Sequence, residues 1–408
     1  MLMAAGASAT AAADWPHIQG PKMDRKTDEQ VATPFPAGGP KRVWDIPVKG
    51  GFGSFVTGGG KAYAVVPLDG RETAMAVDRQ SGKVLWRAPL GATGYTKGGD
   101  RGVPGNDGGD GPRATPVFAD GRVFVFGAHF DLYALDSATG RVVWKHDLLK
   151  EFGGRELHWS NAASPLVIGD RVLVAGGGKG QSLLAFNAAT GQVVWKSGSD
   201  QPSYATPVPA TIHGQLQAIF LTARGLAAVD PTDGRELWTY PFPMQTATAA
   251  SPVVWQDVVH CTAGYGVGGA AVRVKRDGDR WETTELWRIR GARDVASHWM
   301  TAVAHEGYLY GCYGQGAYGS AAFKCIDIQT GKVQWEKPGF GHGQTIMSGN
   351  RLLAISDAGR LVAIEPSPSK YQEVGAAKVI DGKVWASLAL SDGQLFVRSV
   401  AHGVCLEL

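Results

Sequence analysis

One short hairpin pattern recurs along the chain and constrains the fold more than any other feature. Each copy has an alternating apolar strand, an Asp or Asn, a turn containing Gly, and an apolar run that ends in Trp. The Asp or Asn side chain can bond the turn amides, Gly accepts a positive φ, and Val, Leu and Trp fill one face of a pleated strand. The copies read AMAVDRQSGKVLW (74–86), LYALDSATGRVVW (132–144), LLAFNAATGQVVW (183–195), LAAVDPTDGRELW (226–238) and FKCIDIQTGKVQW (323–335).

The spacing of these hairpins indicates a β-propeller. The terminal Trp residues recur every 43 to 58 residues once Trp287 is placed between Trp238 and Trp335. This period fits a blade of four antiparallel strands. A second pattern precedes each hairpin, in which a strand of small residues meets a tight turn and then an apolar strand. Small residues suit the inner strands, because strands from all blades crowd around the central channel.

Counting the inner strands predicts an all-β fold of eight four-stranded blades. The unit at 361–374 is degenerate, with a Pro-rich stretch in place of the turn and Val374 in place of Trp, so seven blades is the alternative. The last repeat stops at 402–408 without a Trp strand, whereas 41–48 (KRVWDIPV) is a Trp strand without a repeat. We expect these two strands to pair, which closes the ring and removes exposed sheet edges.

The repeated Trp and Asp residues are interpreted as structural. Each Trp stands at the same place in its blade, where it is expected to pack between neighbouring blades rather than to hold a ligand. Asp136, Asp230 and Asp327 occupy the turns and are expected to form them, not to act as catalytic acids.

The pattern divides the chain into three parts. Residues 1–13 are small, apolar and uncharged and end in three Ala residues, so they are interpreted as the remnant of a signal peptide, with a disordered Ala-rich terminus as the alternative. Residues 14–40 are an N-terminal extension, and residues 41–408 are a single propeller domain. We therefore expect a periplasmic or secreted protein.

Charge and composition exclude several classes. The formal net charge is +3 and no run of five Lys or Arg occurs, so the basic footprint of a nucleic-acid-binding protein is missing. No stretch approaches the roughly 18 apolar residues of a transmembrane segment. The four cysteines form no CxxC pair. Cys312 and Cys325 flank a Gly-rich turn and are expected to be buried strand residues, with a cross-strand disulfide as the alternative.

The A-x-D-x-x-T-G-x-x-x-W units resemble the repeat of PQQ-like propellers, which occurs in quinoprotein alcohol dehydrogenases and in BamB. The layout is similar to that of exported "PQQ-binding-like" propellers. The matching segments are Asp14-Trp15-Pro16, Gly20-Pro21 with Asp24, Gly109–Pro116 and, more loosely, 264–268. The resemblance covers Asp14 to Leu408 and implies the fold. It leaves the function open, because propellers host many unrelated activities.

The resemblance to quinoprotein dehydrogenases implies a quinone only where the surrounding residues are also present. Those enzymes hold the quinone between a Trp and a disulfide of adjacent cysteines, with a metal ion on Glu, Asn and Asp and a catalytic Asp. This chain has no Cys-Cys pair, and no Asp stands out as a base. We therefore do not expect PQQ and assign no cofactor.

Candidate functional residues lie just before the inner strands, at the mouth of the central channel. Packing alone would favour Ala, Ser or Gly there, whereas these places carry His, Arg, Tyr and Trp. Apolar plates with convergent polar groups are typical of a ligand site. We expect His298, Arg113, Tyr204 and His158 as catalytic candidates, and Trp159, Asn161, Trp299, His342, Gln344 and Trp385 as ligand-binding residues. The exported propellers that the chain resembles also carry a His at the place of His298, and Arg113 can pair with a carboxylate in bidentate fashion.

Three functions are compatible with these residues. The first is a site for a small molecule, a carbohydrate or a phenolic compound, where His and Tyr exchange protons in a lyase or isomerase reaction. The second is an envelope scaffold that binds a protein partner. The third is a quinoprotein, or an enzyme with a divalent metal held by His158, His298 and His342. The Gly-rich loop 91–111 is interpreted as a lid, since its Asp100, Asp107 and Asp110 lack EF-hand spacing.

Overall fold

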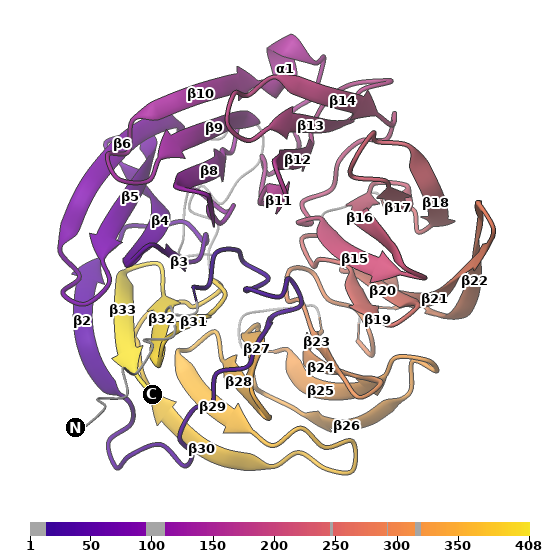
Figure 1. Ribbon diagram of the computed structural model, residues 1–408. Coiled ribbons are helices and arrows are strands. Elements are labelled where there is room, and N and C mark those ends of the chain that lie inside the picture. Colours follow the sequence, from indigo (N-terminus) through magenta and orange to yellow (C-terminus); the bar gives the residue numbers. More distant parts are fainter. Residues whose placement is uncertain (1–13, 95–110, 245–247, 292, 315–319) are drawn as a thin grey trace, which may run out of the picture.

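The computed structural model describes residues 14–94, 111–244, 248–291, 293–314 and 320–408. Over these residues the chain forms eight small sheets that stand around a central axis as the blades of a β-propeller (Figure 1). The prediction of an all-β, eight-bladed propeller is confirmed, and the seven-bladed alternative is wrong. Successive strands of a blade pair with one another in antiparallel fashion, because tight turns join them.

Blades 1 to 4 follow one another along the chain, each running from the channel outwards. Blade 1 consists of β3 (Val56–Gly58), β4 (Lys61–Leu68), β5 (Arg71–Asp78) and β6 (Val84–Ala92), and blade 2 of β7 (Val117–Ala119), β8 (Arg122–Phe126), β9 (Asp131–Asp136) and β10 (Val142–Asp147). Blade 3 consists of β11 (Leu166–Ile168), β12 (Arg171–Ala175), β13 (Leu183–Asn187) and β14 (Val193–Ser197), and blade 4 of β15 (Val208–Ile212), β16 (Gln215–Thr222), β17 (Gly225–Val229) and β18 (Glu236–Pro241).

Blades 5 to 8 complete the ring, and the last two also recruit strands from the N-terminal region. Blade 5 consists of β19 (Val253–Trp255), β20 (Val258–Ala263), β21 (Gly268–Asp277) and β22 (Arg280–Ile289), and blade 6 of β23 (Val303–His305), β24 (Tyr308–Tyr313), β25 (Ala322–Asp327) and β26 (Val333–Lys337). Blade 7 consists of β27 (Gln344–Ser348), β28 (Arg351–Ile355), β29 (Arg360–Ile364) and β30 (Glu373–Lys378), with β1 (Lys26–Thr27) added in parallel to β27, and blade 8 of β31 (Ala389–Ser391), β32 (Gln394–Arg398), β33 (His402–Glu407) and β2 (Lys41–Pro47).

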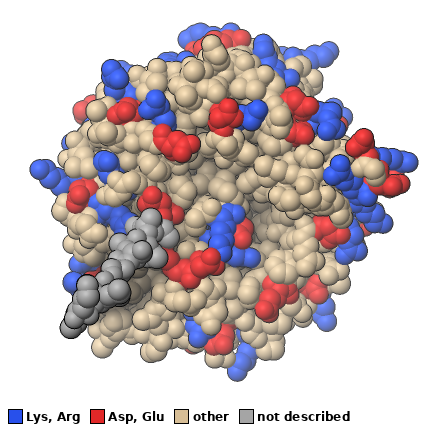
Figure 2. Space-filling model, in the orientation of Figure 1, with Lys and Arg blue, Asp and Glu red and all other residues tan. Residues whose placement is uncertain are grey.

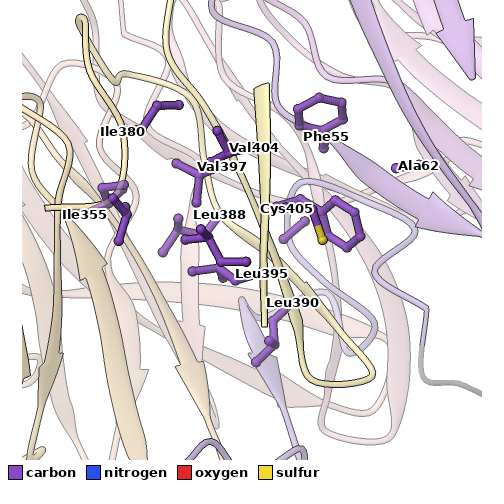
Figure 3. Close-up of a cluster of buried hydrophobic side chains, with 14 of the residues drawn as sticks. Phe55, Ala62, Ile355, Ile380, Leu388, Leu390, Leu395, Val397, Val404 and Cys405 are labelled. Carbon is purple, nitrogen blue, oxygen red and sulfur yellow. The ribbon is translucent and has the colours of Figure 1, made fainter. Parts of the chain in front are cut away.

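The ring closes through the pairing that the sequence predicts. Strand β2 pairs with β33 in antiparallel register, and Trp44 lies opposite Cys405. Blade 8 packs through a continuous apolar core (Figure 3) against blade 7 on one side and blade 1 on the other. On the blade 1 side, Phe55 contacts Trp44 and Phe396. The degenerate seventh unit is a complete blade in spite of its missing Trp, because β29 and β30 still pair.

The repeated Trp residues join each blade to the next at the outer edge. The indole N–H of Trp144 donates to the Ala188 carbonyl in the hairpin turn of the following blade, at 3.0 Å. The Trp residues of blades 1, 3, 5, 6 and 8 make the equivalent bond at 2.8 to 3.1 Å: Trp86, Trp195, Trp287, Trp335 and Trp44. In blade 4, Trp238 donates instead to Gln217 Oε1 of its own blade. The interpretation of these residues as blade-packing residues is confirmed.

The turn residues act as their chemistry predicts. Asp136 accepts hydrogen bonds from the backbone N–H of Ala138 and from both the N–H and the hydroxyl of Thr139. Gly191 has φ +74°, and a Cβ on it would lie 2.8 Å from the indole of Trp144. Glycine is therefore needed there for its backbone conformation and for the close approach of the neighbouring blade.

A ring of hydroxyls surrounds the channel just before the inner strands. One Ser or Thr per blade occupies the same place, and we call this set the hydroxyl girdle: Ser54, Thr115, Ser164, Thr206, Ser251, Thr301, Thr345 and Ser387. Backbone N–H groups donate to the hydroxyl of the next blade, as from Ser54 to Thr115 at 2.9 Å and from Thr115 to Ser164 at 3.0 Å. The same link joins blade 8 to 1, blade 3 to 4 and blade 5 to 6.

Residues 14–27, the N-terminal segment, cross one end of the channel (Figure 1). Trp15 is fully buried; its N–H donates to the Thr57 hydroxyl of blade 1, and its carbonyl accepts from the Thr57 N–H. The Gln19 amide donates to Ser251 of the girdle at 2.7 Å. Arg25 bonds the girdle residue Ser387 from the same side. The sequence treats this stretch only as an extension, whereas the structure makes it part of the channel wall.

The four cysteines form no disulfide bond. All four cysteines are buried and free, so the alternative of a Cys312–Cys325 disulfide is wrong. The register explains this result, because Cys312 lies opposite Phe323 and Cys325 opposite Tyr310. The described residues form one short helix, α1 (Leu148–Glu151), and none with the length and apolar character that crossing a bilayer requires.

Candidate functional site

The mouth of the channel lies on the side of the girdle opposite the N-terminal segment. The residue two places before each girdle hydroxyl differs from blade to blade, and the eight are Phe52, Arg113, Ala162, Tyr204, Ala249, Trp299, Gly343 and Trp385. Four blades thus place an aromatic side chain at one level of the ring and one blade places an arginine there. This variation contrasts with the constant Ser or Thr beside it, and it marks the mouth as the part of the repeat that departs from packing rules.

The aromatic rings of the mouth form a connected series, which we call the aromatic arc. It begins on blade 3, where Trp159 stacks on Tyr265 with ring centroids 6.2 Å apart. Tyr265 meets His298 at 4.9 Å, and His298 meets Trp299 at 4.9 Å. The arc then reaches blade 8, because Trp299 lies 4.4 Å from Trp385, and blade 1, because Trp385 lies 5.0 Å from Phe52. The structure therefore brings the predicted Trp159, His298, Trp299 and Trp385 into one surface.

His298 stands in the middle of the arc with both ring nitrogens available. Neither nitrogen bonds any residue that the structure describes, and the side chain is half-buried. Burial, with a smaller contribution from the nearby His342, lowers the pKa of His298 to about 4. The imidazole is therefore neutral at neutral pH, and it offers one donor and one acceptor to a ligand.

The blade 2 and blade 3 side of the mouth is held by backbone contacts. Arg113 donates from Nη1 to the Trp159 carbonyl at 2.6 Å, and the Trp159 N–H donates to the Tyr204 hydroxyl at 3.2 Å. Burial raises the pKa of Tyr204, so its hydroxyl keeps its proton. His158 is exposed and its ring packs edge-on against Trp159 at 4.8 Å. Arg113, Tyr204, Trp159 and His158 thus form one contiguous group.

Three predicted ligand-binding residues are buried below the surface of the mouth. The Asn161 amide bonds the Phe126 and Ala163 carbonyls and the Ala163 N–H, so its hydrogen-bonding groups serve the backbone. Gln344 donates to the Trp299 and Trp385 carbonyls at 3.4 and 3.3 Å, which positions the two indoles. His342 is 2% exposed and stacks under Trp299 at 5.0 Å. These residues support the arc rather than line its surface.

The expected three-His metal site does not form. Within the described ranges, no three His, Cys, Asp or Glu side chains are close enough to hold one ion. The Trp299 ring lies between His298 and His342, and His158 belongs to blade 3 whereas the other two lead into blades 6 and 7. The divalent-metal hypothesis based on His158, His298 and His342 is therefore wrong for this arrangement.

Glu72 is a group that sequence reasoning missed. This β5 side chain is 2% exposed, and its Oε2 accepts from the Ala128 N–H of blade 2 at 3.0 Å, while the buried Oε1 bonds no described residue. Burial raises the pKa of Glu72 to about 7, with Arg113 and His129 acting in the opposite direction. A carboxyl group that titrates near neutral pH beside a channel mouth is typical of a functional site. Nothing in the pattern around residue 72 signals it, because its burial depends on the next blade.

Phe52, Tyr265 and Lys383 also belong to the mouth and were not predicted. Tyr265 is 44% exposed at the centre of the arc, and the Lys383 ammonium lies 4.3 Å from the Trp385 ring centroid. Phe52 could have been found from its register, two residues before Ser54. The predicted lid, residues 91–111, with Asp100, Asp107 and Asp110, falls almost entirely outside the described residues.

An eight-bladed propeller of Trp-anchored hairpins defines the class of PQQ-like propellers, and comparison with known proteins agrees. The chain belongs to the family described as outer membrane protein assembly factor BamB, whose model matches residues 70–313. It is 24% identical to the outer membrane protein assembly factor BamB of Shewanella oneidensis over 264 residues, which is 62% of this chain and 64% of the relative. It is 28% identical to the quinoprotein ethanol dehydrogenase of Pseudomonas putida over 146 residues, 32% of this chain and 23% of that enzyme.

Solved structures confirm the fold across nearly the whole chain. BamB from Moraxella catarrhalis aligns with a TM-score of 0.56 at 15% identity, covering 90% of this chain and all of that one. The quinohemoprotein alcohol dehydrogenase from Comamonas testosteroni aligns with a TM-score of 0.64 at 12% identity, covering 96% of this chain and 80% of that one. The chain spans less than two thirds of the length of the curated relatives that it matches in sequence.

The mouth does not fit the quinone arrangement that the dehydrogenase resemblance implies. The four free cysteines stand at positions 261, 312, 325 and 405, so no adjacent pair can form the disulfide plate. The mouth instead carries indole and imidazole rings that pack on one another. The residues present therefore do not form the quinone arrangement.

Proposed function

We propose that this protein is an envelope propeller that binds a small ring-shaped molecule, a carbohydrate or a phenolic compound, at the mouth of its channel. The observation that supports this proposal most strongly is the aromatic arc with the unbonded His298 at its centre. Indole and phenol rings offer flat apolar faces, and a few polar groups beside them fix the orientation of a ligand. The location in the cell envelope is inferred from the relatives in the outer membrane assembly family.

The arc also holds hydrogen-bond donors that are not used within the described part of the chain. The indole N–H groups of Trp299 and Trp385 are buried and meet no acceptor. Buried donors are normally paired, so each unpaired one favours a partner from outside. Because both are closed off from solvent, a ligand hydroxyl or carboxylate would reach them only as the two rings shift. Gln344, which bonds both backbone carbonyls, would hold the chain in place during that shift.

Binding is tested by titrating the protein with a panel of uronic acids and phenolic acids in a calorimeter. A ligand that uses the arc should lose at least tenfold in affinity in Trp299→Ala and in His298→Gln. Trp255→Ala is the matched control, since Trp255 is a half-buried indole near Lys26 at the other end of the channel. Equal losses in Trp299→Ala and Trp255→Ala would remove the mouth as the site.

Turnover at this mouth would be proton transfer of the lyase or isomerase type. His298 is a neutral base, Tyr204 is a protonated donor, and Arg113 lies beside it to hold a carboxylate. These groups require no organic cofactor. The test is product formation from a ligand that binds. His298→Gln should abolish turnover, and its effect on affinity should be smaller than its effect on turnover. If the native protein binds the ligand but never converts it, the protein has a binding function and no enzymatic one.

A second candidate function, docking to an envelope protein, is favoured by the outer edge of blades 1 to 3. The residues just before the repeated Trp are exposed and apolar in these three consecutive blades: Leu85, Val142, Val143, Val193 and Val194. Blade 4 carries the exposed Glu236 at the place of Val142, two residues before its Trp. A photo-crosslinking residue at Val142 should capture one defined envelope partner, and the same residue at Glu236 should not. Absence of any crosslink at Val142 in intact cells would argue against this function.

A further inference from the structure

The N-terminal segment leaves part of its end of the channel open. A cavity of about 270 Å³ lies between this segment and the inner strands of blades 4, 5 and 6. Figure 2 shows the face that carries the segment, with a hollow near its centre and Lys and Arg side chains beside it. This cavity is on the opposite side of the girdle from the aromatic arc, and it is a separate space with different chemistry.

Arg25 lines the cavity and is a buried cation without a carboxylate partner. It is 2% exposed, and its Nε donates to the Thr345 carbonyl at 2.8 Å. Its Nη2 donates to Gln344 Oε1 at 3.2 Å and to Ser387 Oγ at 2.7 Å, so every acceptor is neutral. The Nη1 atom bonds no described residue, although it is not among the polar atoms sealed from solvent. A buried charge without a counter-ion is costly, which favours an anion beside it.

A second buried arginine shows what Arg25 lacks. Arg398 is 1% exposed, and its Nη1 donates to the Gly53 and Val65 carbonyls at 2.8 Å while its Nη2 bonds the Gly50 carbonyl. Both terminal nitrogens of Arg398 are therefore used, and Arg398 does not line the cavity. Arg25 has one terminal nitrogen without a described partner and is one of the residues that line the cavity.

The rest of the lining adds one further donor and a positive balance of charge. The Thr301 hydroxyl accepts the Ser251 N–H at 3.0 Å, which leaves its own proton to donate. Lys22 and Lys26 also line the cavity, with Asp24 as the acidic residue of the lining. Lys22 pairs with Asp28 at 2.5 Å, and Lys26 lies 3.7 Å from Asp24. The cationic groups exceed the acidic ones, so the rim attracts anions.

We propose that this cavity binds a small anion whose oxyanion group, a carboxylate or a phosphate, is held by Arg25 Nη1 and the Thr301 hydroxyl. The volume is below the range of about 300–1,000 Å³ that is typical of drug-sized ligands, which favours a compact di- or tricarboxylic acid or free phosphate over a longer chain. The ligand supplies the counter-ion that Arg25 lacks. The site does not require the function proposed for the mouth, but Arg25 bonds Gln344, which bonds the Trp299 and Trp385 carbonyls. The test therefore also needs a variant that leaves the Arg25–Gln344 contact intact.

The proposal is tested by calorimetric titration of the full chain with succinate, citrate and inorganic phosphate, each against sodium chloride of equal ionic strength. The native protein should bind at least one of these anions in a saturable manner. Arg25→Gln should weaken that binding at least tenfold. Arg398→Gln, the matched loss of an equally buried arginine, should leave the affinity unchanged. Carboxylates and phosphate are separated by which of them saturates.

A cavity-filling variant keeps the test decisive if Arg25→Gln does not fold. Thr211 of β15 lines the cavity and is exposed, so Thr211→Trp should fill the space without entering the core. It should abolish anion binding and leave the melting temperature close to that of the native protein. The proposal is overturned if no anion binds more tightly than chloride, if Arg25→Gln and Arg398→Gln lose binding equally, or if Thr211→Trp binds as the native protein does.

Discussion

The outer and inner edges of the blades follow different rules. At the outer edge, blade after blade carries the same Trp, and its indole N–H donates to the turn of the next blade. At the inner edge, the residue two places before the girdle changes from Trp299 to Gly343 to Trp385 in consecutive blades. The repeated residues of the outer edge join neighbouring blades, whereas the varied residues of the inner edge make no such repeated bond. This contrast predicts that substitutions at the rim reduce stability most, and it supports the proposal of a ligand site at the channel mouth.

The largest expected effect is the loss of a rim tryptophan. Trp144→Ala removes a buried indole, its bond to Ala188 and its contact with Gly191, and should lower the free energy of unfolding by about 3–5 kcal/mol. Urea denaturation of the purified variant measures this loss. Trp299→Ala at the half-buried mouth should cost clearly less. A mouth variant that destabilises as much as the rim variant would contradict the division between the two edges.

The pH dependence of stability should next distinguish Glu72, a buried acid between blades 1 and 2, from an acid of the rim. Burial gives Glu72 a folded pKa of about 7 against about 4.5 when unfolded, so the folded state binds more protons between these values. Stability from this group is present below pH 4.5 and is lost as the pH rises through 7, by about 3 kcal/mol in total. The rim acid Asp136 behaves in the opposite sense, because its bonds to Thr139 lower its pKa and its contribution is lost as the pH falls.

Denaturation of the native protein and of Glu72→Gln at pH 5 and pH 8.5 tests this difference. Relative to Glu72→Gln, the native protein should be less stable at pH 8.5 than at pH 5. A constant difference between the two proteins at both pH values would show that Glu72 does not titrate in this range.

Two glycines with the same backbone conformation test the contact between blades at the rim. Gly191 and Gly214 both have φ +74°, but only Gly191 lies against a Trp of the neighbouring blade. Gly214→Ala should cost about 1 kcal/mol from backbone conformation alone. Gly191→Ala should cost about 2 kcal/mol more, because its Cβ overlaps Trp144. Melting curves of the two variants give the comparison directly, and equal losses would mean that the contact between blades contributes nothing.

The smallest expected effect concerns the hydroxyl girdle. Thr115→Val keeps the shape of the side chain but leaves the Ser54 N–H without an acceptor, which should cost about 1 kcal/mol. Thr115→Ser restores the hydroxyl and should recover most of the loss. Chemical denaturation of the Val and Ser variants measures the difference in their free energies of unfolding. A Val variant as stable as the Ser variant would show that the girdle bonds do not contribute to stability.

The features that repeat could be predicted from the sequence, and the features that depend on the neighbouring blade could not. The Asp136 turn, the packing role of Trp144 and the closure through Trp44 each follow from a local pattern and were predicted. Burial of Glu72 by blade 2 and the unbonded nitrogen of Arg25 follow from contacts between distant segments. The N-terminal segment has no periodicity to signal that it enters the channel.

At the channel mouth, too, the sequence predicted positions in the repeat but not contacts between distant side chains. Counting residues before the inner strands was enough to find Trp299, Trp385 and His298. It was not enough to tell which of these side chains would face one another, so a three-His metal site stayed open as an alternative, although Trp299 packs against both His298 and His342 and no such group forms among the described residues. The strand register gives the position of a residue along the channel axis. The direction in which its side chain points depends on how the neighbouring side chains pack.

The closure of the ring through β2 has a consequence for the order in which the protein folds. Strand β2 leaves the ribosome before any blade is complete, yet its partner β33 is made last, and the ion pair between Lys41 and Glu407 joins residues 366 positions apart. Blades 1 to 6 can assemble from nearby segments, but the seam between β2 and β33 cannot form until residues 402–407 have been made. Such a distant pairing is slow because its loop entropy is lost before any contact is gained. Until then β2 lacks its strand partner, and an unpaired strand edge is prone to aggregation.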